Sequence, residues 1–133
     1  MIPSPSAEQS AIASQLAREL ASYRDGLQAL LHGSWDPERY RSLSEQFDRM
    51  QMLVGAFPRW SLPWTELLIS RAELMHALWN LRTPARVDGR VQALHALHGM
   101  RVDELLDCCR RCEAAAAPDA RVAQGAAPTD RAR

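Results

Sequence analysis

The chain has 133 residues, the size of a single domain. Apolar residues make up 47% of it and charged residues 24%, which excludes a wholly disordered chain and a fibrous repeat. Sixteen cationic side chains balance sixteen anionic ones, so no general attraction to nucleic acid or acidic membranes is expected. All sixteen cations are arginine, which excludes lysine chemistry such as Schiff-base formation.

The sequence lacks the usual signals of export and membrane insertion. No segment reaches the ~20 apolar residues that a membrane-spanning helix needs, and residues 1–10 lack the basic-then-apolar order of a signal peptide. Three cysteines, Cys108, Cys109 and Cys112, cannot all pair within one chain, which favours a reducing compartment. We therefore expect a soluble, cytoplasmic protein.

The first predicted helix covers residues 6–32. Ser6 and Gln9 form a capping box at its start, and Gly33 is a residue typical of the position just past a helix end. Apolar side chains recur at intervals of three and four, which places them on one face. This stripe consists of Ile12, Leu16, Leu20, Tyr23, Leu27 and Leu30.

The second predicted helix begins after Asp36, an N-cap residue followed by Pro37 at the first helical position, and Pro58 ends it. Its stripe consists of Tyr40, Leu43, Phe47, Met50, Val54 and Phe57. Two prolines within residues 58–64 predict a connection, and Pro63 can open the next helix.

The third and fourth predicted helices cover about 63–83 and 84–115. The stripe of the third consists of Trp64, Leu67, Leu68, Leu74, Met75, Leu78 and Leu81. The stripe of the fourth consists of Val87, Val91, Leu94, His98, Val102, Leu105, Cys109 and Cys112. Because His98 falls within this stripe, we expect it to be a buried, hydrogen-bonded core residue.

The pattern as a whole predicts an all-α fold, an antiparallel up-down four-helix bundle in which each helix neighbours the next. We assign residues 1–115 to this domain. Residues 116–133 are rich in alanine and proline and nearly free of large apolar side chains, so we predict a disordered tail.

A metal site is not expected in the fourth helix, although Cys108 and Cys112, and also His95 and His98, are spaced as ligand pairs. The ten residues from His98 to Cys108 span about 15 Å of helix, far beyond zinc–ligand bond lengths of about 2.3 Å. We expect the cysteines to line the core, and we expect no metal and no cofactor.

The segment from His95 to Gly99, His-Ala-Leu-His-Gly, resembles the His-x-Leu-Lys-Gly signature of histidine phosphotransfer domains, which are four-helix bundles. The resemblance implies that His95 is a phosphoacceptor, that Leu97 is a buried anchor and that Gly99 admits a partner's phosphoaspartate. This sequence has His98 where that family has lysine. A structural role for both histidines is the preferred interpretation.

The aromatic connection at residues 57–64 has two interpretations. In one, it folds back as a lid over the end of the bundle. In the other it is a partner-binding surface, since Trp and Arg are enriched at binding hot spots. The predicted partner-binding residues are Phe57, Arg59, Trp60, Leu62 and Trp64, of which Trp60 and Leu62 lie outside both helical stripes.

Arginines are predicted to gather at the opposite end of the bundle, beside Trp35 and Trp79. They form a candidate site for anions or anionic lipid: Arg39, Arg41, Arg82, Arg86 and Arg90. Acidic residues interleave with them, so a self-paired, solvated end is the alternative.

No combination of nucleophile and base, no pair of catalytic carboxylates and no glycine-rich phosphate loop is present, so we do not expect an enzyme. The junction at residues 31–36, Leu-His-Gly-Ser-Trp-Asp, resembles the Gly-x-Trp-Asp junction of small flagellar and type III export chaperones of bacteria. The resemblance covers the first two helices and implies a cytosolic chaperone that masks an amphipathic helix of an exported subunit.

The sequence therefore predicts a non-enzymatic, protein-binding bundle, an export chaperone or adaptor, whose partner is another protein. The alternatives are a phosphorelay protein and a bundle that binds anionic lipid at its tip. Nucleic-acid binding is not expected, and membrane contact and a homodimer stay open.

Overall fold

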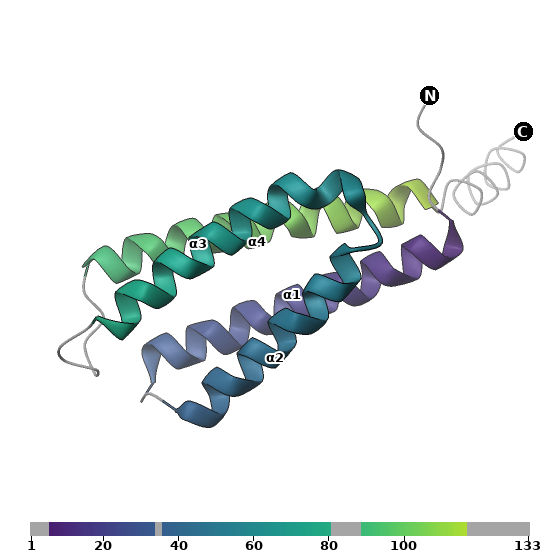
Figure 1. Cartoon of the computed structure of the whole chain (residues 1–133). Helices are drawn as coiled ribbons and strands as arrows, with labels where there is room; N and C mark the ends of the chain where they lie inside the picture. Colours follow the sequence, from purple (N-terminus) through teal and green to yellow (C-terminus); the bar gives the residue numbers. More distant parts are fainter. Residues whose placement is uncertain (1–5, 34–35, 81–88, 117–133) are drawn as a thin grey trace, which may run out of the picture.

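The computed structural model describes residues 6–33, 36–80 and 89–116, and within these ranges all regular structure is helical (Figure 1). The elements are α1 (Ala7–His32), α2 (Pro37–Val54), the short 3-10 helix η1 (Pro58–Trp60), α3 (Ser61–Trp79) and α4 (Gly89–Ala116). They form the antiparallel up-down four-helix bundle that the sequence predicts.

The predicted starts of the first two helices are confirmed. The Ser6 hydroxyl accepts the backbone N–H of Gln9 at 3.0 Å, and the Gln9 side chain accepts the N–H of Ser6 at 3.3 Å, which is a capping box. The Asp36 carboxylate accepts the N–H of Glu38 at 3.0 Å, and Pro37 is the first residue of α2.

The boundaries around the aromatic connection differ from the prediction. Helix α2 ends at Val54, because the next two residues turn the chain, and α3 begins at Ser61 rather than Pro63. Phe57 has φ −129° and ψ 82°, outside the helical region, as expected for a residue before proline. The predicted end of the third helix and start of the fourth, near residues 83 and 84, lie outside the described residues. The predicted disordered tail begins at residue 116, but Ala116 is the last residue of α4, and the rest of the tail, 117–133, lies outside the described residues.

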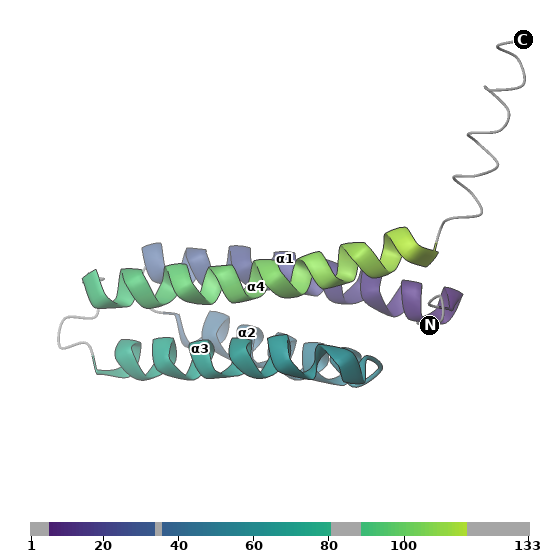
Figure 2. The same cartoon turned by 90° about the horizontal axis from the view of Figure 1, so that it is seen from above.

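The four helices form two layers, α1 with α4 and α2 with α3 (Figure 2). Backbones approach closely between α1 and α4, α3 and α4, and α1 and α2. The seam between α2 and α3 is wider than predicted for consecutive helices, because large rings fill it. Phe47 stacks on Trp64 with 5.0 Å between ring centroids, and Tyr40 meets Trp79 edge-on at 6.0 Å.

The core runs the whole length of the bundle, and α1 contributes buried residues from its second turn to its last. Surface ion pairs and hydrogen bonds tie α4 to both neighbours. Arg24 of α1 pairs with Asp103 at 2.5 Å, and Ser14 of α1 donates to Glu113. None of the described helices is long and apolar enough to cross a membrane.

Candidate interaction site

The aromatic connection is a lid on the bundle, so the prediction that Trp60 belongs to a partner surface is corrected. Trp60 is only 5% exposed and stacks on Phe57 with 3.8 Å between centroids and a 16° angle between planes. Phe57 is buried as well, and Trp64 is buried against Phe47. The 3-10 turn folds Trp60 back onto the core, which helical periodicity does not reveal.

Two of the five predicted partner-binding residues remain at the surface. Arg59 is exposed and lies close to Cys112. Burial raises the pKa of the Cys112 thiol, and the Arg59 guanidinium acts against this. Leu62, in the first turn of α3, is 68% exposed. Leu62 is therefore the apolar member of the predicted set that a partner can reach.

Leu62 belongs to a longer apolar pattern that the sequence analysis did not identify. On α3 the residues at successive intervals of three, four, three and four positions are all exposed, and we call them the outer seam of α3: Leu62, Thr65, Ile69, Ala72 and His76. Ile69 is 55% exposed. The Thr65 hydroxyl donates to the carbonyl of Ser61 at 2.7 Å, so it needs no partner from outside the helix. Four of the five positions of the seam thus carry an apolar or a small side chain.

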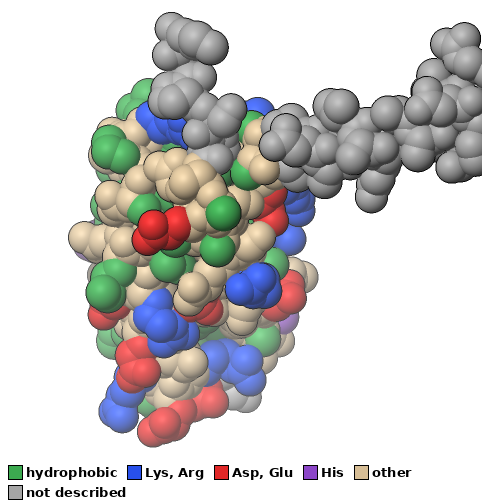
Figure 3. Space-filling view, turned by 90° about the vertical axis from the view of Figure 1, so that its right-hand side faces the viewer, with side chains coloured by type: hydrophobic (Ala, Val, Ile, Leu, Met, Phe, Trp, Pro, Cys, Tyr) green, Lys and Arg blue, Asp and Glu red, His purple; other side chains and the backbone are tan. Residues whose placement is uncertain are grey.

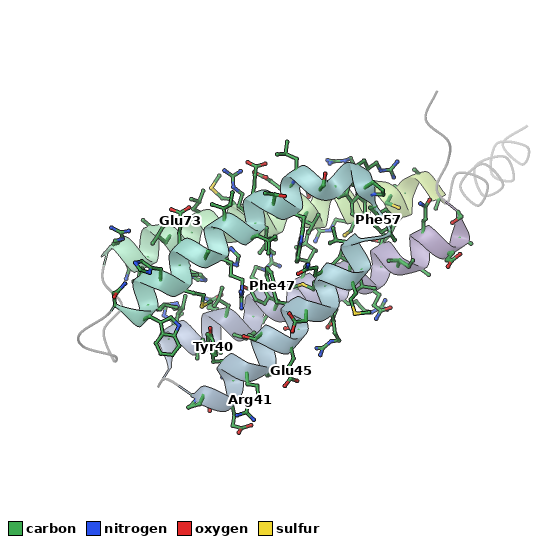
Figure 4. The ribbon with its side chains drawn as sticks, in the orientation of Figure 1. Tyr40, Arg41, Glu45, Phe47, Phe57 and Glu73 are labelled. Atoms are coloured by element: carbon green, nitrogen blue, oxygen red, sulfur yellow. The ribbon has the colours of Figure 1, made fainter. Side chains whose placement is uncertain are left out.

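Acidic residues flank the outer seam on the side of α4. Glu66 and Glu73 each follow a seam position by one residue, and Glu73 lies on the side of α3 turned away from α2 (Figure 4). Arg101 of α4 pairs with Glu66 at 3.3 Å and with Glu104 at 3.0 Å. Two carboxylates thus share one guanidinium, and with Glu73 beside them this surface is acidic.

Met100 is a further exposed apolar side chain, on the neighbouring helix α4. The pairing of Arg101 with Glu66 places the start of α3 opposite the middle of α4, and Met100 is 59% exposed beside this pair in the sequence. Seen from the end where α1 begins and α4 ends, charged side chains dominate the lower part, over α2, whereas hydrophobic ones are spread over the upper part (Figure 3). Of the five exposed large apolar side chains among the described residues, four lie on α3 and α4.

The inner face of α3 carries a buried polar network, and the expected burial and hydrogen bonding of His98 are confirmed. His98 is fully buried on α4. Its Nε2 lies 2.8 Å from the hydroxyl of Tyr23 on α1, and its Nδ1 lies 2.7 Å from the hydroxyl of Ser70 on α3. One imidazole therefore joins three of the four helices.

The proton positions in this network follow from Ser70. Its hydroxyl donates to the carbonyl of Leu67 at 2.9 Å, so its oxygen is left to accept a proton from His98 Nδ1. Nε2 is then unprotonated and accepts from the Tyr23 hydroxyl. Burial, followed by the charges of Arg71 and His95, lowers the pKa of His98 to about 4, so the ring is neutral at pH 7. Burial also raises the pKa of Tyr23, which keeps its proton.

Arg71 of α3, next to Ser70, connects this region to α2, the helix that the network does not include. Its guanidinium carbon lies 4.4 Å from the centroid of the Phe47 ring on α2, a cation–π contact, and it donates to the Ser44 hydroxyl at 3.5 Å. Its buried Nε has no hydrogen-bond acceptor within the described ranges. The charge of Arg71 therefore rests on an aromatic face in the wide α2–α3 seam.

His95 is half-buried on α4, and burial together with nearby His32 lowers its pKa. A histidine phosphotransfer domain needs a cation at the position of His98, but this ring is neutral and enclosed by Tyr23 and Ser70. A Cβ built on Gly99 meets no atom within 4 Å, so the space beside it is open. The role of His95 as phosphoacceptor stays a prediction.

Only part of the predicted anion site lies within the residues that the structure describes. Arg39 and Arg41 at the start of α2 and Arg90 at the start of α4 are exposed. Arg82 and Arg86 lie outside the described residues. The contact between Tyr40 and Trp79 confirms that the first turns of α2 and the last turn of α3 share one end of the bundle.

The cysteines lie where the helical stripe predicts. Cys109 and Cys112 are buried and Cys108 is half-buried. Burial, with a contribution from Cys108, raises the pKa of the Cys109 thiol to about 12. Among residues 6–33, 36–80 and 89–116, no group of three or more His, Cys, Asp or Glu side chains is placed to hold a metal ion.

The comparisons with known proteins found no relative of this chain. No protein-family model, no curated protein and no solved structure matches the chain. The resemblances to export chaperones and to phosphotransfer domains therefore rest on their short motifs, and Ser34 and Trp35 of the chaperone-like junction lie outside the described residues.

Proposed function

We propose that this protein is a non-enzymatic, protein-binding helical bundle that acts as a cytosolic chaperone or adaptor and binds its partner on the outer seam of α3. One observation carries the proposal: α3 is apolar on both of its faces. Its inner face is buried in the bundle, whereas Leu62 and Ile69 on its outer face are 68% and 55% exposed. An exposed apolar stripe that is rimmed by charged side chains is typical of a protein interaction surface.

Two further features support a binding role. The exposed apolar side chains lie on a helix rather than on a loop, so the bundle holds them in fixed positions before a partner arrives. The neighbouring helix α4 carries a further exposed apolar side chain, Met100. The export-chaperone form of the proposal rests in addition on the junction at residues 31–36, in which Asp36 caps α2.

The proposal is tested by comparing what the wild-type protein and the variant Leu62→Ser/Ile69→Ser capture from the cytosol of the native organism. We expect the variant to keep its fold, because both side chains are exposed, and to lose the main captured protein. The matched control is Met52→Ser, which removes an 81% exposed side chain from α2. Capture that is equal for wild type and double variant contradicts the proposal.

A further inference from the structure

The outer seam of α3 has the spacing of a coiled-coil interface. Its five positions follow the alternation of three and four residues that defines positions a and d of a heptad. Leu62 and Ile69 both occupy position a and are two turns apart, about 10 Å along the helix axis. Position d holds Thr65 and Ala72, small side chains that allow a second helix to approach closely.

The acidic flank of the seam determines which helix fits. Glu66 and Glu73 follow positions d directly and therefore both occupy position e, where charges select coiled-coil partners. Arg101 forms ion pairs with both Glu66 and Glu104, so its single positive charge does not neutralise the flank. Among the described residues, Glu73 has no ion-pair partner. A partner helix thus meets a net negative charge beside the apolar seam.

A second copy of this chain does not supply the missing cations. In an antiparallel α3–α3 pair centred on Ile69, Glu66 of each chain faces Glu73 of the other, and like charges repel. In a parallel pair, position e faces position g, which holds Ser61, Leu68 and Met75 and no cation.

We propose that the outer seam of α3 binds an amphipathic helix of a different protein, one with a heptad-spaced apolar stripe flanked by arginine or lysine. This inference rests on the proposed function and names the partner class. Apolar contact with Leu62 and Ile69 supplies the affinity, and ion pairs with Glu66 and Glu73 supply the selectivity.

The test uses the full-length protein and three model peptides of three heptads each. The peptides share leucine at positions a and d and differ only at the flanking positions e and g, which are all arginine, all glutamine or all glutamate. Fluorescence anisotropy gives their dissociation constants. We expect the arginine peptide to bind about ten-fold more tightly than the glutamate peptide at 0.05 M salt, and this preference to shrink at 0.5 M salt.

Variants separate the two parts of the proposal. Glu66→Gln/Glu73→Gln is expected to remove the preference between peptides while retaining binding of the glutamine peptide. Leu62→Ser/Ile69→Ser is expected to weaken all three. The matched control, Glu38→Gln/Glu45→Gln, changes two exposed acids of α2 and is expected to keep the preference. Circular dichroism and urea unfolding verify that each variant folds.

Three results overturn the inference: equal binding of the arginine and glutamate peptides, a preference that survives Glu66→Gln/Glu73→Gln, or a stable homodimer in sedimentation experiments that Leu62→Ser/Ile69→Ser dissociates. The proposed function fails separately. It is contradicted if the native partner is captured equally by wild type and Leu62→Ser/Ile69→Ser, whereas loss of that capture without peptide selectivity leaves it standing.

Discussion

Protonation of His98 should make the stability of the bundle depend on pH in a narrow window. Burial lowers the pKa of this imidazole from its ordinary 6.5 to about 4, so the folded protein holds fewer protons than the unfolded chain between these values. The free energy of unfolding is therefore highest above pH 6.5, and it falls as the pH drops toward 4. The neutral ring is required because Nε2 must accept a hydrogen bond from the Tyr23 hydroxyl.

The size of the effect follows from the shift. Once the pH is below both pKa values, protonation of His98 in the unfolded chain has lowered the free energy of unfolding by roughly 3 kcal/mol. About 2 kcal/mol of this fall occurs between pH 7 and pH 5. Urea unfolding followed by tryptophan fluorescence at pH 5, 6 and 7 measures it. Working at pH 5 and above limits the contribution of carboxylates, which titrate mainly at lower pH.

A variant assigns the effect to this side chain. His98→Gln has no titratable ring and should lose most of the pH dependence, although half-buried His95 retains a contribution of the same sign. The control His76→Gln removes an exposed imidazole and should behave like the wild type. Equal stability of the wild type at pH 5 and pH 7, or an unchanged pH dependence in His98→Gln, would refute this account of the core.

Three further predictions concern the lid, the tail and the alternative function. Trp60→Ala should destabilise the fold by about 3 kcal/mol in urea unfolding, because it empties a stacked, buried site, whereas Leu62→Ala should stay within about 0.5 kcal/mol of wild type. Deletion of residues 117–133, which carry almost no large apolar side chains, should leave the melting temperature unchanged, and a fall of more than about 5 °C would show a docked segment. Incubation with phosphorylated receiver domains should give no phosphoryl transfer to His95, because neutral His98 stands where the phosphotransfer family has a cation; transfer that His95→Gln abolishes would support the phosphorelay alternative.

Local signals in the sequence were sufficient to predict most of the architecture. The capping box at Ser6 and the Asp36-Pro37 start of α2 depend on neighbouring residues only, and both are confirmed. The burial of His98 was equally predictable, because the apolar positions before and after it define the inward side of α4. Capping motifs and helical periodicity therefore predicted helix starts and buried positions that the structure confirms.

The candidate site was harder to predict, because it depends on how distant segments meet. Trp60 has no periodic context, and its burial results from a 3-10 turn that folds it onto Phe57. Ser70 carries no signal among the leucines of α3, since its role appears only when α4 brings His98 beside it. Ile69 was missed because the apolar positions of α3 fit more than one stripe, and only the packing shows which of them is inside.

The polar network explains why the outer seam of α3 stays outside. A rotation of α3 by one residue, about 100°, would turn Ile69 toward the core and Ser70 away from it. Burying an isoleucine side chain yields about 1.5–3 kcal/mol, but the same rotation would carry fully buried Leu74 to the exposed place of Glu73, so apolar burial gives no clear net gain. The rotation would also leave His98 Nδ1 buried without a partner and withdraw Arg71 from the face of Phe47. The unmet hydrogen bond and the displaced charge oppose the rotation, so the network inside the bundle holds an apolar, heptad-spaced surface available to a partner.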